Sequence, residues 1–274
     1  ARSHGIAVLE LQPGAAAGAF ALTGPAAGAA RESGRAEAAD VALVLHTSGT
    51  TGRPKIVPLS HANLCASARN IRRTLDLSTT DRCLNIMPLF HIHGLVASTL
   101  STFHSGGTLV VPPRFNPMGF WPIVEAHGAT WFSAVPTMFN ALLTRARGEK
   151  AQGAQNLRFI RSCSASLAPT TLEQMESTFG APVVEAYGMT EAAHQMASNA
   201  LPPGERRPGS VGRGTGVKIG IMDQHGALQA SGTTGEVVIS GPNVIQGYES
   251  NPEANASSFI DGWFRTGDQG VLAE

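Results

Sequence analysis

The sequence predicts an α/β fold, in which a mostly parallel sheet with flanking helices precedes a small antiparallel, β-barrel-like subdomain. From residue 41 to about residue 186, short apolar runs of β type alternate with helical patterns. This alternation is typical of βαβ crossovers and a parallel sheet. After residue 191, prolines and glycines break the chain, and the short strand patterns that follow indicate antiparallel pairing.

The individual elements follow from the apolar spacing. Strands are expected at 41–46, 83–87, 108–111, 130–135, 158–162 and 183–186, and helices at 61–75, 93–104, 117–127, 136–147 and 169–179. Ser60 is a candidate N-cap for the first helix. Further on, strands are expected at 217–222 and 235–240, and Gly226 can adopt positive φ in a turn after the first of them.

Three regions are expected from these patterns. Residues 1–40 form a loose Ala/Gly-rich segment, because residues 12–40 have no clear strand or helix period. Residues 41–200 form an α/β subdomain and residues 201–274 a β-rich subdomain. We find no internal repeat.

Composition excludes several classes of protein. The formal net charge is zero and the pI about 7.3, which disfavours binding to nucleic acid or to an anionic membrane. No apolar stretch is long enough to span a bilayer and no secretory signal begins the chain, so a cytoplasmic location is expected. The three cysteines have neither disulfide nor zinc-ribbon spacing. The sequence does not define the oligomeric state.

A polar run between two apolar segments has the composition of a phosphate-binding loop. Small residues let backbone N–H groups approach oxygen anions, hydroxyls add donors, and a terminal lysine adds positive charge. The residues are Thr47, Ser48, Gly49, Thr50, Thr51, Gly52 and Lys55. Because Arg53 and Pro54 separate the glycine from the lysine, the run is not a Walker loop. A flexible linker is the alternative, but a preceding strand and a following helix favour a nucleotide site.

Residues 47–55 resemble the phosphate-binding signature of the adenylate-forming acyl-CoA synthetase and luciferase superfamily. Three further segments, 88–94, 185–191 and 262–268, resemble that superfamily in the expected order. The resemblance begins near residue 40. It implies that the chain is the central part of the large N-terminal domain and lacks the mobile C-terminal domain, which carries a reacting lysine and part of the thiol channel. We therefore expect this chain alone to be impaired in the first half-reaction and essentially inactive in the second.

The resemblance also implies roles for individual residues. Lys55, Thr190 and Glu191 would be catalytic, with Thr190 at the α-phosphate of ATP and Glu191 holding Mg²⁺. Tyr187 would pack on adenine and Asp268 would bind the ribose hydroxyls; a core aromatic and a turn carboxylate are the alternatives. The remaining nucleotide contacts implied are Ser164, Ala165, Ser166, Glu185, Ala186, Gly188 and Met189. Ser166 is also a candidate cap for the helix ahead of Pro169.

Residues 157–167 and 185–196 are similar to those of oxalate-CoA ligases. That similarity implies a polar acid pocket in which Ser164, His194 and His93 surround a second carboxylate, because a buried unpaired charge is costly. His91 is a further candidate substrate contact. For His93 the alternative is a satisfied core histidine, and for His194 a helix-surface residue. Two histidines alone make a poor zinc site.

The function expected from the resemblance is that of an ATP-dependent acid–CoA ligase, acting on oxalate or another short dicarboxylate. A carboxylate attacks ATP to form an acyl-adenylate, and coenzyme A then displaces AMP to form the thioester. The alternatives are an aryl- or medium-chain acyl-CoA ligase, an adenylation domain that loads a carrier protein, and a noncatalytic nucleotide-binding module.

Overall fold

The computed structural model describes residues 2–5, 7–16, 18–25, 34–47, 54–146 and 153–273. They belong to two compact units, Ala1–Ala36 and Glu37–Glu274. The first unit contains a short 3₁₀ helix, η1 (Arg2–His4), and an antiparallel hairpin of β1 (Glu10–Pro13) and β2 (Phe20–Thr23). Both strands are exposed along their whole length. With neither face buried, these short strands have no sustained apolar–polar pattern, and the sequence did not indicate them.

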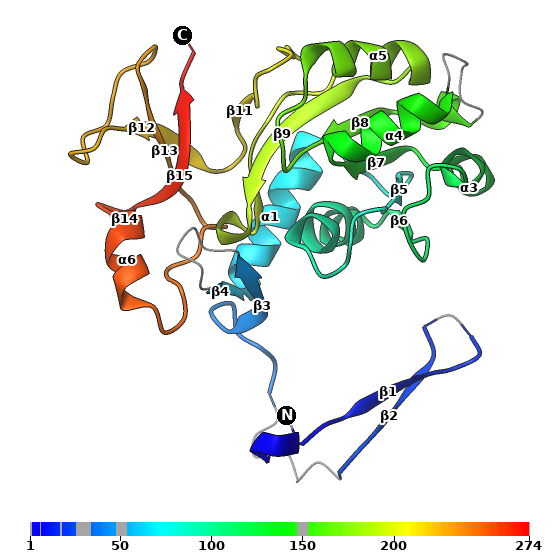
Figure 1. Cartoon of the computed structure of the whole chain (residues 1–274), viewed down its shortest axis with the longest axis horizontal. Helices are drawn as coiled ribbons and strands as arrows, with labels where there is room; N and C mark the ends of the chain where they lie inside the picture. The colour runs from blue at the N-terminus through cyan, green and yellow to red at the C-terminus, as the bar shows by residue number, and fades with distance from the viewer. Residues whose placement is uncertain are drawn as a thin grey trace. The chain divides into compact units, whose positions relative to one another are not determined.

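The second unit is built on a seven-stranded sheet with the order β11-β10-β9-β8-β7-β5-β6 (Figure 1). The strands from β9 to β6 pair in parallel, and β10 and β11 add antiparallel strands at one edge. The predicted mostly parallel sheet is confirmed. Its strands are β5 (Arg82–Leu84), β6 (Thr108–Val110), β7 (Trp131–Ala134), β8 (Phe159–Ser162), β9 (Val183–Met189), β10 (His194–Ser198) and β11 (Arg213–Gly214).

Helices cover both faces of this sheet. Trp131 and Phe159 pack into one apolar cluster with residues of α1, whereas their neighbours Phe132 and Ile160 pack into a second cluster with residues of α3, α4 and α5. Successive strand residues point to opposite faces, so a strand that is buried on both sides carries apolar residues at successive positions. The helices are α1 (His61–Thr74), α3 (Phe120–His127), α4 (Pro136–Ala146), α5 (Pro169–Phe179) and a 3₁₀ turn, η3 (Ala154–Asn156).

Two helix starts test the predicted caps. Ser60 Oγ accepts a hydrogen bond from the Asn63 N–H at 3.1 Å, and Asn63 Oδ1 accepts one from the Ser60 N–H at 3.0 Å. This capping box confirms Ser60 as the N-cap of α1. The predicted cap at Ser166 is wrong, because α5 begins directly at Pro169 and its N-cap is Ala168.

The segment expected over 93–104 is helical but irregular. It begins as a π-helix, η2 (His93–Leu100), and continues as α2 (Ser101–Ser105). A Cβ on Gly94 would lie 2.4 Å from the carbonyl oxygen of Pro88, so only glycine lets the two backbones meet there. π-Helical turns are rare and occur often at functional sites.

The region around the candidate phosphate loop differs from the expected strand–loop–helix. β3 (Val41–Thr47) pairs antiparallel with β4 (Lys55–Ser60), and α1 starts only after β4. Thr47 and Lys55 are opposite each other in this ribbon. The ribbon is a separate two-stranded sheet rather than part of the parallel one. The helix expected over 61–75 agrees with α1, but no strand was expected where β4 lies.

The predicted antiparallel part is a four-stranded sheet with the order β12-β13-β15-β14. A turn at Gly226, with φ of +87°, follows β12 as expected. The Asn251 side chain accepts a hydrogen bond from the Ala254 N–H and caps α6. The elements are β12 (Lys218–Met222), β13 (Thr234–Ser240), α6 (Pro252–Ser258), β14 (Phe259–Ile260) and β15 (Trp263–Val271).

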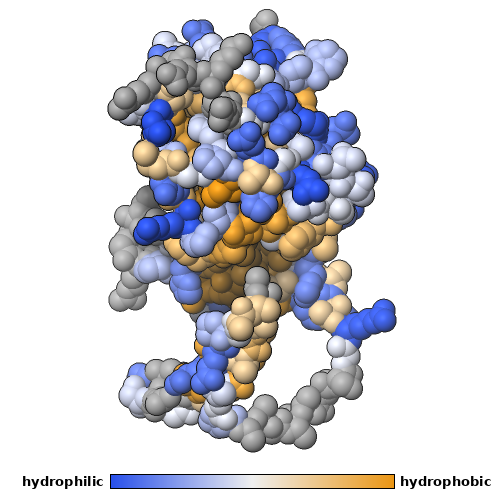
Figure 2. All heavy atoms as spheres, turned by 90° about the vertical axis from the view of Figure 1, so that its right-hand side faces the viewer, coloured by the Kyte–Doolittle hydropathy of each residue, from blue (hydrophilic) through white to orange (hydrophobic). Residues whose placement is uncertain are grey.

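Apolar side chains also lie at the surface. Figure 2 shows apolar atoms between hydrophilic ones over the face that it draws. Phe20 in the first unit is 58% exposed, and Phe90 in the second unit is 81% exposed. None of the helices formed by the described residues combines the length and the apolar character needed to cross a membrane.

Candidate nucleotide and acid site

The candidate site is organised around the tight hairpin formed by β9, η4 (Thr190–Ala192) and β10. The Asn243 side chain donates hydrogen bonds to the carbonyl oxygens of Ala192 at 2.7 Å and Gln195 at 3.1 Å. Ser67 on α1 donates to the Ala193 carbonyl oxygen at 2.6 Å. These buried contacts satisfy the backbone of the hairpin and hold it against α1. Asn243 and Ser67 are distant in sequence, and no local pattern indicated them.

The hairpin backbone is tightly constrained. Ala193 and His194 have φ values of +47° and +95°, which are unusual for residues other than glycine. A Cβ on Gly188 would lie 2.1 Å from the His194 carbonyl oxygen. Glycine is therefore required at position 188 by a close backbone approach. Such strain persists only where the surroundings enforce it, and it is common at functional sites.

Two of the predicted nucleotide residues contact each other. The Tyr187 hydroxyl on β9 donates a short hydrogen bond to Asp268 Oδ2 on β15. Burial, together with this carboxylate, raises the pKa of the Tyr187 phenol. Asp268 itself is exposed, and Gly267 before it has a φ of +78°. The antiparallel sheet thus brings Asp268 to the end of the parallel-sheet strand that carries Tyr187.

A second tyrosine connects Lys55 with Glu191. The Tyr248 hydroxyl donates to Glu191 Oε1 at 2.9 Å, and Lys55 Nζ lies 4.6 Å from the centre of the Tyr248 ring. Burial first, and then the Glu191 carboxylate, raise the pKa of the Tyr248 phenol. A cation over an aromatic face is attracted by its quadrupole. Tyr248 lies outside the four sequence segments, and nothing in the sequence indicated its role.

The predicted acid-pocket residues also come together. His93 at the start of η2 is fully buried, and its Nδ1 lies 3.1 Å from Ser164 Oγ. Its Nε2 lies 2.6 Å from the hydroxyl of Ser133 on β7. The His194 ring is centred 4.9 Å from the His93 ring. Ser164, after the end of β8, has a φ of +70°, so it too has an unusual backbone for a serine.

His194 is 1% exposed, and neither of its ring nitrogens has a hydrogen-bond partner among the described residues. Burial, followed by the positive charge of Arg161, lowers the pKa values of His194 and of His93 well below the usual range. Both rings are therefore neutral at pH 7. The helix-surface interpretation of His194 is wrong, because the residue begins β10 and is buried.

Arg161 on β8 contacts the same serine, Ser133, as His93 does. No sequence pattern assigned a role to this arginine. It is completely buried, and it donates to Ser133 Oγ at 3.1 Å and to Gln195 Oε1 at 2.9 Å. In the described part of the chain no carboxylate forms an ion pair with it. Burial lowers the pKa of its guanidinium, although arginine stays charged in proteins. An uncompensated buried cation is costly, and it generates a positive potential beside His93 and His194.

Other predicted residues take separate positions. Glu185 is buried on β9; its carboxylate accepts a hydrogen bond from the Gly209 N–H at 3.0 Å, and burial raises its pKa. His91 is exposed, and its Nδ1 accepts from the His93 N–H at 3.2 Å. The residues Ala165 and Ser166 are exposed after β8, whereas Ala186, Met189 and Thr190 lie in the hairpin. Ser48, Gly49, Thr50, Thr51 and Gly52 lie outside the described residues.

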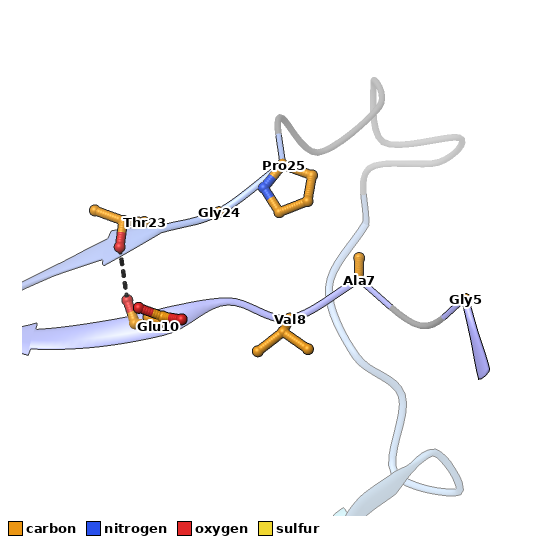
Figure 3. Close-up of a pocket in the computed structure, with 7 residues that line it drawn as sticks. All are labelled: Gly5, Ala7, Val8, Glu10, Thr23, Gly24 and Pro25. Atoms are coloured by element: carbon orange, nitrogen blue, oxygen red, sulfur yellow. Dashed lines mark hydrogen bonds between the residues drawn. The ribbon is translucent and has the colours of Figure 1, made fainter. Parts of the chain in front are cut away.

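Two surface hollows lie beside described residues. One, of about 610 Å³, lies in the first unit beside the β1–β2 hairpin (Figure 3). There the Thr23 hydroxyl donates to the Glu10 backbone oxygen at 3.4 Å, and none of the described lining residues is basic, which does not suit phosphate. The other, of about 660 Å³, adjoins β15 and includes Asp268 and Arg265. Of the two, the second touches a predicted site residue and the first does not.

The side chains present limit how a metal could bind. Within the described ranges, no three His, Cys, Asp or Glu residues are grouped so that they could hold a metal ion by themselves. Glu191 is 6% exposed, and its Oε2 accepts no hydrogen bond from any described residue. Mg²⁺ is commonly held by one or two carboxylates together with substrate phosphates. A single carboxylate such as Glu191 fits that mode and does not fit an all-protein cage.

Comparison with known proteins agrees with this architecture. The family described as AMP-binding enzyme matches residues 5–249. The chain is 49% identical over 236 residues to the oxalate–CoA ligase of Arabidopsis thaliana, covering 85% of this chain and 46% of that protein. It is 49% identical over 241 residues to the oxalate–CoA ligase of Saccharomyces cerevisiae, covering 87% of this chain and 44% of that protein.

The fold comparison gives the same family. ATP-bound MatB from Rhodopseudomonas palustris matches with a TM-score of 0.81 and 34% identity, over 87% of this chain and 47% of that structure. The chain thus spans slightly less than half the length of these relatives. It belongs to the AMP-binding enzyme family. The predicted family and fold are confirmed.

Proposed function

We propose that the chain supplies nucleotide- and acid-binding surfaces of an ATP-dependent acid–CoA ligase that acts on oxalate or another short dicarboxylate. The reaction forms an acyl-adenylate and pyrophosphate, and coenzyme A then takes the acyl group as a thioester and releases AMP. Membership of the AMP-binding enzyme family and the names of the two relatives support this class. Because those relatives are about twice as long, the complete reaction is proposed for a protein of their length.

The nucleotide would bind between the hairpin and β15. Tyr187 packs on adenine in this proposal, and Asp268 exchanges its bond with Tyr187 for bonds to the ribose hydroxyls. Lys55, at the end of the loop 47–55, neutralises phosphate charge, while Thr190 contacts the α-phosphate. The contact between Tyr187 and Asp268 supports this arrangement, because it brings the two nucleotide segments together. Electrostatic stabilisation of the phosphates is the main requirement of phosphoryl chemistry.

Mg²⁺ is proposed to bind at Glu191, where it would supply charge neutralisation to the phosphates of ATP. The contribution of the chain is to hold the carboxylate in place. Tyr248 does this by hydrogen bonding to Oε1, and the Ile245 N–H donates to the Glu191 carbonyl oxygen at 2.9 Å. Coenzyme A is proposed as the second substrate from the family alone.

The observation that carries the substrate proposal is the polar cluster of His93, Ser164 and His194 in front of the buried Arg161. A fatty-acyl pocket needs apolar walls, because methylene groups gain by leaving water and polar groups lose by burial without partners. Here His194 has two buried nitrogens without partners in the described chain, and an arginine without a carboxylate lies behind it. A small anion would accept a hydrogen bond from the ring nitrogen of His194 that carries the hydrogen, and it would offset the charge of Arg161. Oxalate combines small size with two carboxylates.

The proposal is tested by pyrophosphate release in the presence of ATP and Mg²⁺, with oxalate, malonate, benzoate and octanoate compared in parallel. The assay is run on the chain and on any longer form in which it occurs. Oxalate is expected to give the highest kcat/KM, followed by malonate. A His194→Leu variant should lose activity with oxalate and retain ATP binding. If octanoate or benzoate ranks first, the dicarboxylate proposal is wrong and a medium-chain or aryl acid ligase is the better description.

A further inference from the structure

Four side chains form a continuous hydrogen-bonded series from the core to the surface, here called the relay. Arg161 Nη1 lies 3.1 Å from Ser133 Oγ, Ser133 Oγ lies 2.6 Å from His93 Nε2, and His93 Nδ1 lies 3.1 Å from Ser164 Oγ. Arg161, Ser133 and His93 are completely buried, whereas Ser164 is exposed. The relay thus begins at a buried cation and ends where a ligand can arrive.

The direction of the hydrogen bonds is determined at Ser133. A guanidinium group only donates, so the Ser133 oxygen accepts from Arg161. Among the described residues, the only other hydrogen-bond partner of this hydroxyl is His93 Nε2. If His93 donated instead, the Ser133 hydrogen would be buried without an acceptor, which is unfavourable. The Ser133 hydroxyl therefore donates to Nε2.

The same reasoning continues through the imidazole. Burial and the charge of Arg161 lower the pKa of His93, so the ring is neutral and carries a single hydrogen. A cationic ring would also direct a second positive donor at the Ser133 oxygen. With Nε2 accepting, the hydrogen of His93 lies on Nδ1 and points to Ser164 Oγ. The Ser164 oxygen then accepts, and its own hydrogen is free to point outward.

We propose that Arg161 sets the direction of the relay, so that Ser164 offers its hydroxyl hydrogen to a carboxylate of the acid substrate. Arg161 is a positioning residue in this account, because it acts through Ser133 and His93. The part that concerns the acid rests on the proposed function, whereas the direction of the relay does not. If Arg161 only filled space, its replacement would leave the tautomer of His93 unchanged.

The tautomer can be measured directly by NMR of the full chain carrying ¹³C- and ¹⁵N-labelled histidine. The His93 signals are assigned by their loss in His93→Gln, because the chain has nine histidines. We expect the Nδ1–H tautomer in the unaltered chain, a switch toward Nε2–H in Arg161→Met, and retention of Nδ1–H in Arg161→Lys, whose ammonium can still donate to Ser133. An Nε2–H tautomer in the unaltered chain would overturn the inference, even if no variant folds.

Calorimetry then tests the consequence for the acid. Arg161→Met is expected to weaken oxalate binding roughly tenfold, as for a lost hydrogen bond to a charged group, and to leave ATP binding unchanged. Arg161→Lys should largely restore the affinity. Arg158→Met is the matched control, since Arg158 directly precedes the same strand, β8, but pairs with Asp81.

The two proposals fail in different ways. If the unaltered protein binds no short dicarboxylate but His93 has the expected tautomer and switches in Arg161→Met, the proposed function fails and the direction of the relay stands. If oxalate binds and Arg161→Met changes neither the tautomer nor the affinity, the relay inference fails and the proposed function stands.

Discussion

The Tyr248 hydroxyl donates a 2.9 Å hydrogen bond to the Glu191 carboxylate. The only other tyrosine of the chain, Tyr187, donates to Asp268 in the same way. Each phenol is thus held by a carboxylate that the sequence assigned to the nucleotide site. The two pairs place the tyrosines between the parallel sheet and the segments that follow it.

These pairs predict a loss of stability at alkaline pH. Burial and the neighbouring carboxylates raise the pKa of both phenols in the folded chain, so the unfolded chain loses its phenol protons first, near pH 10. Their contribution to stability is therefore complete below about pH 10 and is lost as the pH rises through the higher folded pKa. Urea unfolding between about pH 8 and pH 11 measures how the unfolding free energy changes with pH. This range brackets the unperturbed tyrosine pKa of about 10.

The matched variants are Tyr187→Phe and Tyr248→Phe, each of which removes one phenol and preserves the ring. Each should make the alkaline loss of unfolding free energy shallower, and spectrophotometric titration should show one fewer late-ionising phenol. Equal slopes in the parent and in both variants would show that the phenols are not coupled to folding.

The lowered pKa of Asp81 predicts a loss of stability at acid pH. Burial by itself would raise its pKa, but hydrogen bonds from Arg158, the Ser78 N–H and Thr130 outweigh burial and lower it. A lowered folded pKa contributes stability above the unfolded value of about 4, and this contribution is lost as the pH falls through the folded value. Asp81→Asn should therefore reduce the unfolding free energy at pH 7 by about 1–3 kcal/mol and flatten the acid dependence. Glu205→Gln, in an exposed pair with Arg207, should behave like the parent.

Gly188→Ala tests the close approach within the hairpin. The new Cβ would meet the His194 carbonyl oxygen at 2.1 Å, so the backbone must move. We expect a loss of about 1–3 kcal/mol in unfolding free energy, the usual range for overpacking, with weaker oxalate binding because His194 shifts. Gly34→Ala is the control, since a Cβ there meets nothing within 4 Å. A Gly188→Ala chain as stable as Gly34→Ala would contradict the close approach of the two backbones.

Lys55 and Glu191 carry opposite charges, so replacing each of them tests a different part of the proposed nucleotide site. Lys55→Ala removes a positive charge and should weaken ATP·Mg²⁺ binding roughly tenfold. Glu191→Ala should abolish most of the dependence of ATP affinity on Mg²⁺ while affecting metal-free ATP less. Calorimetry with and without Mg²⁺ measures both, and Lys218→Ala, at an exposed position of β12, controls for net charge. Unchanged affinity in both variants would remove the two residues from the site.

Local sequence was sufficient for the strands of the parallel sheet and for the helices that flank it. The apolar runs around Phe132 and Ile160 predicted buried parallel strands because such strands are covered on both faces. Ser60 predicted the start of α1 because its side chain satisfies a backbone donor three residues away. The β3–β4 ribbon was not predicted, since the pairing of Thr47 with Lys55 depends on backbone contacts between residues that are separated in the sequence.

Sequence alone determined the family segments, the alternation of strands and helices, and the residue types available for binding phosphate and carboxylate. Only the tertiary structure decided which of them meet: Tyr187 with Asp268, Glu191 with Tyr248, and His93 with Ser133 and Arg161. The physical reason is that periodicity reports which face of an element is buried, whereas a hydrogen bond between distant residues depends on how those elements pack. The charge state and the tautomer of a buried side chain depend on that packing as well.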